Sequence, residues 1–296
     1  MSDISVPTFA VVVLTMGQRP EALARALGSV TDQQGVKSDV VVVGNGWRPL
    51  DLPDGVKSVH LLENAGIPAG RNAGVRHVSG DFLLFLDDDS WLIGRDFLRQ
   101  TWERLAANDA LGMIQPRIVD PSRPGEEPLR WIPRIHKGHP ERSSVAFSVL
   151  ETAVVIPRSV FERAGGWPGS FFYAHEGIEL AWRVWDQGLC VEYHGDLQVG
   201  HPVVEPTRHE QYYYFNARNR VWLARRCLPW PLGWIYVINW TAIQLLRTRE
   251  LRPLRVWMRG WHDGWRETPW KGQAPLKHLP WRTVARMARH GRLLIV

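Results

Sequence analysis

Runs of apolar residues alternate with amphipathic segments along the first third of the chain. The runs at 9–15, 38–46 and 56–63 are rich in valine and leucine and predict buried strands, because a strand covered on both faces needs no polar side. Residues 19–30 have the apolar spacing of a helix, with Pro20 in its first turn. Strands that alternate with helices predict an α/β fold with a mostly parallel, twisted sheet and helices on both faces.

A fourth apolar run ends in three aspartates. The segment FLLFLDDDS, at 82–90, places Asp87, Asp88 and Asp89 at the carboxyl end of a predicted strand, which is the edge where α/β sheets bind ligands. The three carboxylates repel one another unless a cation neutralises them, and hard oxygen ligands suit Mg²⁺ or Mn²⁺. The competing interpretation is a solvated strand end in which one aspartate caps the next helix. The chain contains no GxxxxGK[ST] motif, so the cluster favours a diphosphate held through the metal.

Two further carboxylates stand on a predicted helix in the second half of the chain. Residues 151–167 predict a strand and then a helix, whereas 120–143 are rich in proline and charge and predict a long loop. The segment 176–189 predicts an amphipathic helix, on which Glu176 and Glu179 share a face. Their structural interpretation is an ion pair for Glu179 and a favourable contact of Glu176 with the helix N-terminus.

Composition and charge narrow the class of protein. The chain has 296 residues, 45% of them apolar, which is enough for one large domain and an appendage. Its two cysteines, Cys190 and Cys227, lack the spacing of a zinc site and fit a reducing cytoplasm. The N-terminal segment has no basic region, and its apolar run is too short for a signal peptide or a spanning helix. The net charge of +6 comes from the region that begins at Arg247, and the residues before it are mildly acidic.

Four segments, in this order, resemble the family 2 glycosyltransferases of the GT-A fold. They are VVVLTMGQRP at 11–20, ENAGIPAGRNAG at 63–74, FLLFLDDDS at 82–90, and AGGWPGSFFYAHEGIELAWRVWDQG at 164–188. The third carries the aspartate pair of the family's D-x-D motif, and the fourth is similar to the family's segment that ends in a Glu-Asp pair. Each segment alone is a weak signal, but the ordered set covers about residues 8–200 and is specific.

The resemblance implies transfer of a sugar from a nucleotide-diphosphate sugar (UDP, dTDP or GDP) to an acceptor hydroxyl, with inversion and with Mg²⁺ or Mn²⁺. The residues it implies for nucleotide-sugar binding are Thr15, Arg19, Asn45, Asn64, Gly66, Arg71, Asn72, Asp87 and Asp88. The residues it implies for the metal are Asp87, Asp89 and His201. It implies Glu176 as the general base, with Glu179 either structural or in contact with the acceptor.

Three positions depart from the family pattern. Gly44 stands where many relatives have an aspartate, Gly70 replaces an alanine, and Gly177 replaces the aspartate of the Glu-Asp pair. The departures at Gly44 and Gly177 leave open a catalytically inactive nucleotide-sugar-binding or scaffold protein. A sugar nucleotidyltransferase, which also uses a doubly wound sheet, metal and aspartates, is a less favoured alternative. Because 164–220 resembles bacterial rhamnosyl- or galactofuranosyl-transferases, we expect a glycan, glycolipid or small-molecule acceptor in cell-envelope or secondary-metabolite glycosylation.

The chain divides into a catalytic part and a tail of different composition. We expect a catalytic domain at 1–225, whose nucleotide-sugar half is about 8–118 and whose acceptor half is about 145–225. Residues 226–296 predict a helical, basic and aromatic extension.

The extension has three interpretations. Trp257, Trp261 and Trp265 recur at helical spacing among arginines, which suits packing on the catalytic domain or an oligomer contact. The same composition suits peripheral contact of 228–290 with the inner face of the cell membrane, whereas nucleic acid binding is disfavoured. We accordingly expect a cytoplasmic protein, with membrane contact as an open question.

Overall fold

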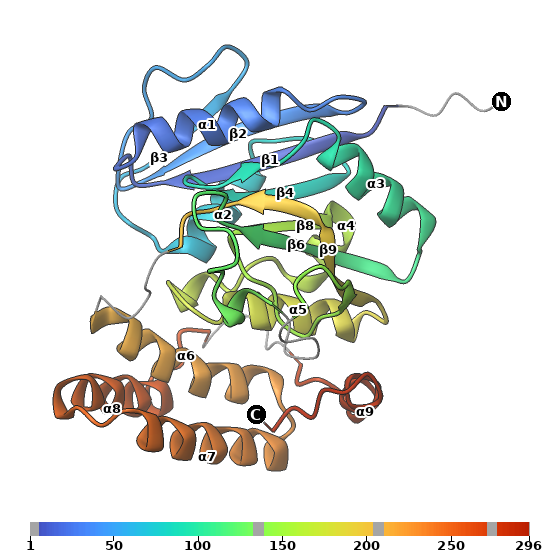
Figure 1. Ribbon diagram of the computed structural model, residues 1–296. Coiled ribbons are helices and arrows are strands. Elements are labelled where there is room, and N and C mark those ends of the chain that lie inside the picture. The colour runs from blue at the N-terminus through green and yellow to red at the C-terminus, as the bar shows by residue number, and fades with distance from the viewer. Residues whose placement is uncertain (1–5, 133–138, 204–209, 271–276, 296) are drawn as a thin grey trace.

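A sheet of nine strands forms the centre of the part of the chain that the computed structural model describes, residues 6–132, 139–203, 210–270 and 277–295 (Figure 1). In chain order the strands are β1 (Thr8–Thr15), β2 (Lys37–Asn45), β3 (Lys57–Leu61), β4 (Phe82–Asp87), β5 (Trp91–Leu92), β6 (Leu111–Val119), β7 (Ser144–Val145), β8 (Ala153–Pro157) and β9 (Cys190–Gly200). The helices are α1 (Pro20–Thr31), α2 (Ile67–Val75), α3 (Phe97–Ala107), α4 (Arg158–Ala164), α5 (Glu176–Asp186), α6 (Glu210–Cys227), α7 (Trp230–Arg247), α8 (Leu251–Arg266) and α9 (Trp281–Arg289). Short 3₁₀ turns occur at Leu129–Trp131 and Gly169–Phe171.

The first half of the sheet is parallel. Its strand order is β3-β2-β1-β4, with Val11 opposite Val40 and Val12 opposite Phe85. The valines and leucines of β1, β2 and β4 are almost completely buried, as expected for strands covered on both faces. This half confirms the predicted strands and brings the ends of β1, β2 and β4 to one edge.

The second half of the sheet is mixed. Strand β8 lies between β4 and β6 and is antiparallel to both, while β9 is parallel to β6. The short strands β5 and β7 add to β9 in antiparallel pairs. This arrangement brings His201, directly after β9, towards the acidic end of β4.

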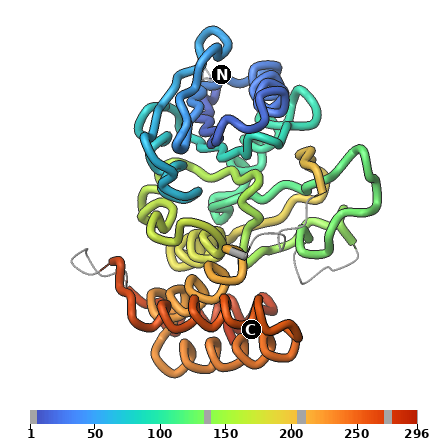
Figure 2. Tube along the Cα trace, turned by 90° about the vertical axis from the view of Figure 1, so that its left-hand side faces the viewer, coloured from blue at the N-terminus to red at the C-terminus, as the bar shows by residue number. Residues whose placement is uncertain are grey.

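Helices cover both faces of the sheet. On one face α1 and α3 pack against the odd-numbered positions of β1, through residues such as Leu27 and Phe97. On the other face α2 packs along β1 and β2, while α4 and α5 cover β8, β6 and β9 and share a core with the even-numbered positions of β1, through residues such as Phe161 and Trp182. The turned view separates the two helical layers (Figure 2), and the predicted α/β architecture is confirmed.

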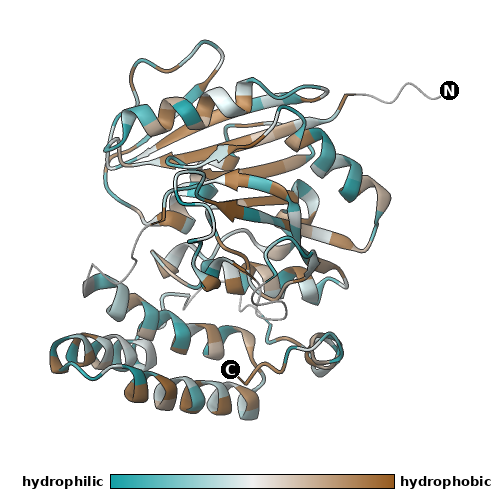
Figure 3. Cartoon of the chain, viewed as in Figure 1, coloured by the Kyte–Doolittle hydropathy of each residue, from teal (hydrophilic) through white to brown (hydrophobic). Residues whose placement is uncertain are grey.

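The C-terminal helices form a further layer beyond α5 (Figures 1 and 2). The apolar core on the α5 side continues into them through Trp222, Tyr236 and Met287. Trp257 is buried, and α8 packs along α6. The helical extension is thus confirmed, and its hydropathy alternates along each helix, unlike that of the central strands (Figure 3). No helix in the described ranges is both long and apolar enough to cross a membrane.

Some predictions about this part fall outside the structure or are left untested by it. Residues 133–138 of the predicted loop at 120–143, and residues 271–276 of the predicted membrane-contact region, lie outside the described residues. The described residues of that loop contain the 3₁₀ turn at Leu129–Trp131. The predicted domain boundary after 225 falls in the last turn of α6 and stays a prediction.

Candidate donor and catalytic site

A pocket of about 450 Å³ opens where β1, β2 and β4 end. Nine of the residues expected to bind the nucleotide sugar or the metal line it: Thr15, Arg19, Asn45, Asn64, Gly66, Asp87, Asp88, Asp89 and His201. They come from strand ends and from the loops that follow them, which are far apart in sequence. The edge of the parallel half therefore assembles these residues as the fold class requires.

Each aspartate of the cluster has a different partner. Asp88 accepts a hydrogen bond of 2.6 Å from the Thr15 hydroxyl. The guanidinium of Arg19 contacts both Asp88 and Asp89, and its side chain is 48% exposed. Beneath the pocket, Nη2 of the buried Arg71 donates to Asp87 Oδ1 at 2.6 Å. Cations thus compensate the carboxylates on both sides of the cluster.

Asp87, Asp89 and His201 form a group that suits a divalent metal. Two carboxylate oxygens and one imidazole nitrogen lie within 4.8 Å of one another, and His201 Nε2 is 3.4 Å from Asp89 Oδ1. Carboxylates are the usual ligands of Mg²⁺ and Mn²⁺, and an imidazole is a common third ligand for a transition metal. These three side chains therefore fit the expected cation.

The pKa values in the cluster reflect burial and charge together. Burial raises the pKa of Asp87 to about 6, although the charge of Arg71 opposes the shift. Burial also raises the pKa of Asp88, against the Thr15 hydrogen bond. For Asp89, burial is outweighed by the hydrogen bond and charge of His201, so its pKa is lowered. The pKa of His201 is correspondingly raised by Asp89 in spite of burial, so that a metal here would displace a proton.

Asn45 and Asn64 hold the turn that leads into α2. Asn45 Nδ2 donates to Asn64 Oδ1 at 2.8 Å, and its Oδ1 accepts from the Ala65 N–H at 2.8 Å. Asn64 Oδ1 also accepts from the Gly66 N–H at 2.9 Å. The backbone explains the departure at Gly44, since a side chain there would collide with the Trp47 carbonyl and the Pro49 ring.

Arg71 and Asn72 face the protein interior instead of lining the pocket. Arg71 is 1% exposed and bridges Asp87 and the Glu151 carbonyl. The Asn72 amide donates to the Trp167 carbonyl at 2.8 Å and accepts from the Trp167 N–H at 3.0 Å. Arg71 therefore connects α2 to the end of β4 and to the turn before β8, and Asn72 connects α2 to the segment after α4.

A buried pair of carboxylates lies at the start of α5. Glu176 is 2% exposed, and its Oε2 has no hydrogen-bond partner among the described residues. Glu151 Oε1 accepts from the Gly177 N–H at 2.7 Å. Burial first, and then the charge of Glu151, raise the pKa of Glu176 to about 8. Burial also raises the pKa of Glu151, so the pair retains a proton at neutral pH.

Gly177 makes room for Glu151. A Cβ atom at position 177 would lie 2.5 Å from Glu151 Oε1 and 2.5 Å from the Val149 carbonyl oxygen. The second carboxylate of the family's Glu-Asp pair has no space here, and the carboxylate of Glu151 occupies that space. Sequence reasoning missed Glu151, because its pairing with Gly177 is made between β8 and α5 and leaves no local motif.

The loop before Glu176 is strained and is held from α6. Phe172, Ala174 and His175 have φ values of 66°, 72° and 70°, a region that non-glycine residues rarely adopt. The amide Nδ2 of the buried Asn219 lies 2.6–2.9 Å from the carbonyl oxygens of Phe171, Tyr173 and Ala174. Asn219 thus fixes the backbone that presents Glu176.

Glu179 has a separate environment. Its carboxylate accepts from Nε and Nη2 of Arg226 at 2.9 and 2.8 Å, and both residues are buried. Arg183, the partner that helical spacing suggests, is more distant, at 4.0 Å. The Glu179–Arg226 pair joins α5 to α6 and does not line the pocket.

Further pocket residues escaped the sequence analysis. They are Leu14, Met16, Gln18, Ile67, Phe172, Tyr173, Gln211, Tyr212 and Phe215. Most are apolar or aromatic. The sequence alone does not show whether such residues lie in the core or at a surface. The cluster of aromatics at 212–215 was the one available signal, and only the fold shows that it faces the donor pocket.

The fold and this site together define a GT-A glycosyltransferase. A family model described as glycosyl transferase family 2 matches residues 10–164, which is more than half of the chain, and the chain belongs to that family. A search of curated proteins finds no match.

Solved structures support the same fold. The chain is similar to the mannosyltransferase PcManGT of Pyrobaculum calidifontis in complex with GDP-Man and Mn²⁺, with 17% identity, a TM-score of 0.54, and coverage of 97% of this chain and 76% of the other. Residues 1–349 of S. aureus TarS in complex with UDP-GlcNAc have 13% sequence identity and a TM-score of 0.59, and the match covers 94% of this chain and 83% of the TarS chain. GalNAc-T7 with UDP, GalNAc and Mn²⁺ has 13% sequence identity and a TM-score of 0.58, and the match covers 79% of this chain and 51% of GalNAc-T7.

Proposed function

We propose that the protein transfers a sugar, with inversion, from a nucleotide-diphosphate sugar to an acceptor hydroxyl in a metal-dependent reaction. The observation that carries this proposal is the Asp87–Asp89–His201 group in a pocket at the ends of the central strands. Glu176, a buried carboxylate whose pKa is raised to about 8, does not line this pocket, but its charge interacts with that of Asp87. The solved relatives hold GDP-Man, UDP or UDP-GlcNAc, two of them with Mn²⁺, which supports this class of donor.

Asp87, Asp89 and His201 would hold the Mn²⁺ or Mg²⁺ ion. When bound, the ion supplies positive charge for the leaving diphosphate. Thr15 positions Asp88, and Arg19 is exposed enough to turn from the aspartates to a phosphate oxygen. Asn45, Asn64 and Gly66 shape the wall for the nucleotide, and UDP, dTDP and GDP sugars are the candidate donors.

Glu176 acts as the general base. The acceptor oxygen forms a bond to the anomeric carbon while its proton passes to the Glu176 carboxylate. The bond from the anomeric carbon to the diphosphate oxygen breaks, and its electron pair leaves with the nucleoside diphosphate. Attack from the side opposite the leaving group inverts the anomeric centre.

Glu151 and Arg71 act as positioning residues in this proposal. Glu151 orients the first turn of α5 through the Gly177 N–H and keeps the pKa of Glu176 high by its charge. A high pKa makes Glu176 a stronger base once it has lost its proton. Arg71 holds Asp87 from below, and Glu179 is structural through its pair with Arg226.

Peripheral membrane contact is a second part of the proposal, and α7 is its best candidate. Trp230, Trp234, Ile238 and Leu246 lie on one face of this helix and are 74%, 46%, 61% and 79% exposed. Aromatic and aliphatic side chains with arginines at the helix end are typical of an interfacial helix. Sedimentation with anionic vesicles should detect such contact.

A cytoplasmic location at the inner face of the membrane, with an envelope acceptor, is the setting we propose.

A thermal-shift screen tests the donor and the metal together. We expect one or more of the UDP-, GDP- and dTDP-sugars to raise the Tm with Mn²⁺ or Mg²⁺, and much less with EDTA. Product analysis of the same mixtures should then show sugar transfer or slow donor hydrolysis. Binding without hydrolysis or transfer to any acceptor would favour the inactive scaffold instead.

A further inference from the structure

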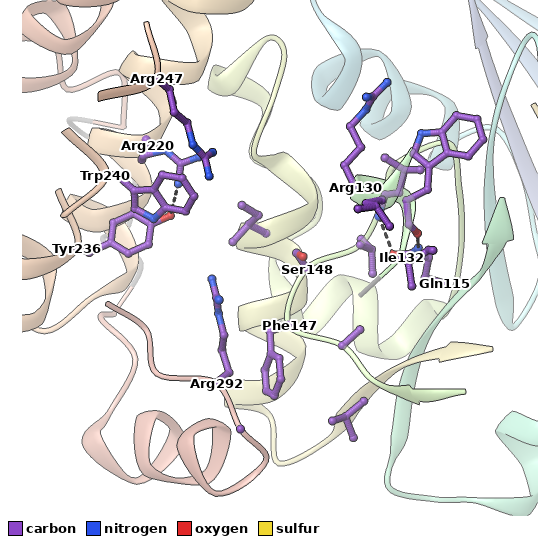
Figure 4. Close-up of a pocket in the computed structure, with 18 residues that line it drawn as sticks. Gln115, Arg130, Ile132, Phe147, Ser148, Arg220, Tyr236, Trp240, Arg247 and Arg292 are labelled. Carbon is purple, nitrogen blue, oxygen red and sulfur yellow. Dashed lines mark hydrogen bonds between the residues drawn. The ribbon is translucent and has the colours of Figure 1, made fainter. Parts of the chain in front are cut away.

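A second cavity, of about 520 Å³, lies between the catalytic part and the C-terminal helices (Figure 4). Its walls come from residues 129–132, residues 145–150, α6, α7 and the segment 291–292 after α9. None of the described residues that line it lines the donor pocket. Its volume is typical of a small-molecule site.

The charged side chains in the described lining of this cavity are all arginines: Arg130, Arg220, Arg247 and Arg292. Three of them, Arg220, Arg247 and Arg292, come from α6, the end of α7 and the segment after α9, and their guanidinium groups face one open space (Figure 4). Arg130 stands on the opposite wall. Like charges brought together by three separate elements favour a bound anion, and guanidinium groups suit the oxygens of phosphate or carboxylate.

Arg220 is held in place by two aromatic residues. Its Nη1 donates to the Tyr236 hydroxyl at 2.9 Å, and its guanidinium carbon is 3.7 Å from the centre of the Trp240 ring. The turn that carries Arg292 is closed by its backbone N–H, which donates to the Met287 carbonyl at 3.0 Å. Fixed cationic groups lose less entropy when a ligand binds.

The rest of the lining is largely apolar. Ile132, Phe147, Ile178 and Trp240 contribute aliphatic and aromatic surface beside the arginines. A free inorganic anion would leave this surface uncovered. The lining therefore suits a molecule that carries both an anionic group and an apolar chain or ring.

The cavity reaches the first turn of α5, because Val149 lines it and the Val149 carbonyl oxygen would lie 2.5 Å from a Cβ atom at Gly177. Val149 and Leu150 line it, and Glu151 follows them directly in the chain. Ile178, also in the lining, is two residues after Glu176 on α5. Tyr173, on the other side of Glu176 in the chain, lines the donor pocket. A ligand in this cavity would therefore lie near the start of α5, and the donor pocket lies near the loop that precedes it.

We propose that this cavity binds the acceptor, and that the acceptor carries an oxyanion beside an apolar chain or ring. This inference rests on the proposed glycosyl transfer, because it assigns the acceptor class of that reaction. Leu245 and Leu246, next to Arg247 on α7, are 49% and 79% exposed, so an apolar surface leads outward from the arginines. The anion has two candidate sources, a lipid phosphate and a soluble phosphorylated molecule.

Calorimetric titration without donor or metal tests the anion site by itself. The probe is phenyl phosphate, and phenol and inorganic phosphate supply its two halves separately. We expect phenyl phosphate to bind about 10-fold more tightly than either half, and the variant Arg247→Gln/Arg292→Gln to lose about 10-fold or more, because each charge-assisted hydrogen bond is worth about one decade. With EDTA present, the three aspartates of the donor pocket disfavour anion binding there.

Arg249→Gln/Arg289→Gln is the matched control. Both arginines are exposed and outside the cavity lining, so this variant changes the net charge equally and should bind the probe as the wild type does. Equal affinity for phenyl phosphate and phenol, or unchanged binding in the cavity variant, would overturn the anion site.

Transfer assays test the acceptor role. Octyl glucoside and glucosyl octyl phosphate differ only by a phosphodiester, and we expect a lower KM for the second in the wild type and an equal KM for both in the cavity variant. Glucose 1-phosphate and glucosyl hexadecyl phosphate in phosphatidylcholine vesicles then separate soluble from lipid sources. Equal KM values in the wild type would overturn this inference and leave glycosyl transfer intact. Arginine-dependent probe binding with no transfer to any acceptor, from any donor, would instead overturn the proposed function.

Discussion

The two groups of acidic residues in this protein are stabilised in opposite ways. Asp87, Asp88 and Asp89 are surrounded by Arg19, Arg71 and His201. Burial raises the pKa of Asp87 and Asp88 but these cations oppose the rise, and the pKa of Asp89 is lowered. Glu151 and Glu176 are compensated by a proton, and the pKa of Glu176 is raised to about 8. The first group is ionised at neutral pH and can hold a metal, whereas the buried second group holds a proton. In the proposed reaction the first group would hold the leaving group and the second would activate the nucleophile.

The largest effect should come from removing the proton acceptor. We expect Glu176→Gln to lower kcat by about 10³, because general base catalysis typically contributes 10²–10⁴. Donor binding in the thermal-shift assay should be retained. Glu162→Gln, at a 61% exposed carboxylate of α4, is the matched control. A Glu176→Gln enzyme of near-normal kcat would show that the second carboxylate group is not catalytic.

Loss of a metal ligand should act on the first group alone. Asp89→Asn keeps the shape of the side chain but removes its charge beside His201. We expect the Mn²⁺ concentration for half-maximal activity to rise by about 10² or more, given that even indirect partners of a metal contribute 10–100-fold. Asp54→Asn, in an exposed loop, should leave this concentration unchanged. Equal metal dependence in Asp89→Asn and the wild type would show that Asp89 does not hold the metal.

The variant Asn219→Ala tests whether the strained loop before Glu176 supports the second acidic group without affecting the first. Asn219→Ala removes the amide that holds the carbonyls of the strained loop. We expect kcat to fall about 10-fold with little change in metal dependence, because small displacements of a catalytic group cost up to about 10². Asn108→Ala, at the exposed end of α3, is the control. Equal losses in kcat and in metal affinity would mean that the loop supports both groups.

The difference between the two groups also explains what the sequence could predict. The aspartates, the strands that carry them and the helix that begins at Glu176 follow local patterns, and the structure places them as expected. Glu151 and Asn219 act through contacts made between β8, α5 and α6. Nothing in their own neighbourhoods marks them, because an acidic residue before a strand or an asparagine in a helix is ordinary.

The sequence did not predict the arginine cavity for a similar reason. Its residues come from segments more than 160 positions apart in the chain, from Arg130 to Arg292. Sequence analysis assigned the arginines of the C-terminal extension to packing or to a membrane surface, because their side chains could be placed on helices but not relative to 145–150. Only the packing of α6 and α7 against that segment shows that they share a cavity.

Glu151 is expected to set the pH dependence of the second group. Glu151→Gln keeps the acceptor for the Gly177 N–H but removes the charge that raises the pKa of Glu176. A general base must lose its proton, so kcat/KM should rise with pH through an ionisation near 8 in the wild type. In Glu151→Gln this limb should move to lower pH.

The double variant Glu151→Ala/Gly177→Asp sharpens the same comparison. It places an aspartate beside the space that Glu151 vacates, but the Val149 carbonyl oxygen would still lie 2.5 Å from the new Cβ atom. We therefore expect the double variant to be no more active than Glu151→Ala, and recovered activity would show that this backbone can move. An unchanged pH limb in Glu151→Gln would make Glu151 a purely structural residue.

The smallest expected effect is on stability. It shows, without any substrate, whether Glu176 is protonated in the folded protein. The pKa of Glu176 is about 8 in the folded protein, above its ordinary value of 4.5, so the folded state binds this proton more tightly than the unfolded state. Stability from this group is therefore present at low pH and is lost as pH rises from about 5 through 8. Glu176→Gln lacks this loss, and its Tm relative to the wild type should increase by a few degrees between pH 5 and pH 9. A constant difference would mean that Glu176 is already ionised at neutral pH, and the two acidic groups would then no longer differ in kind.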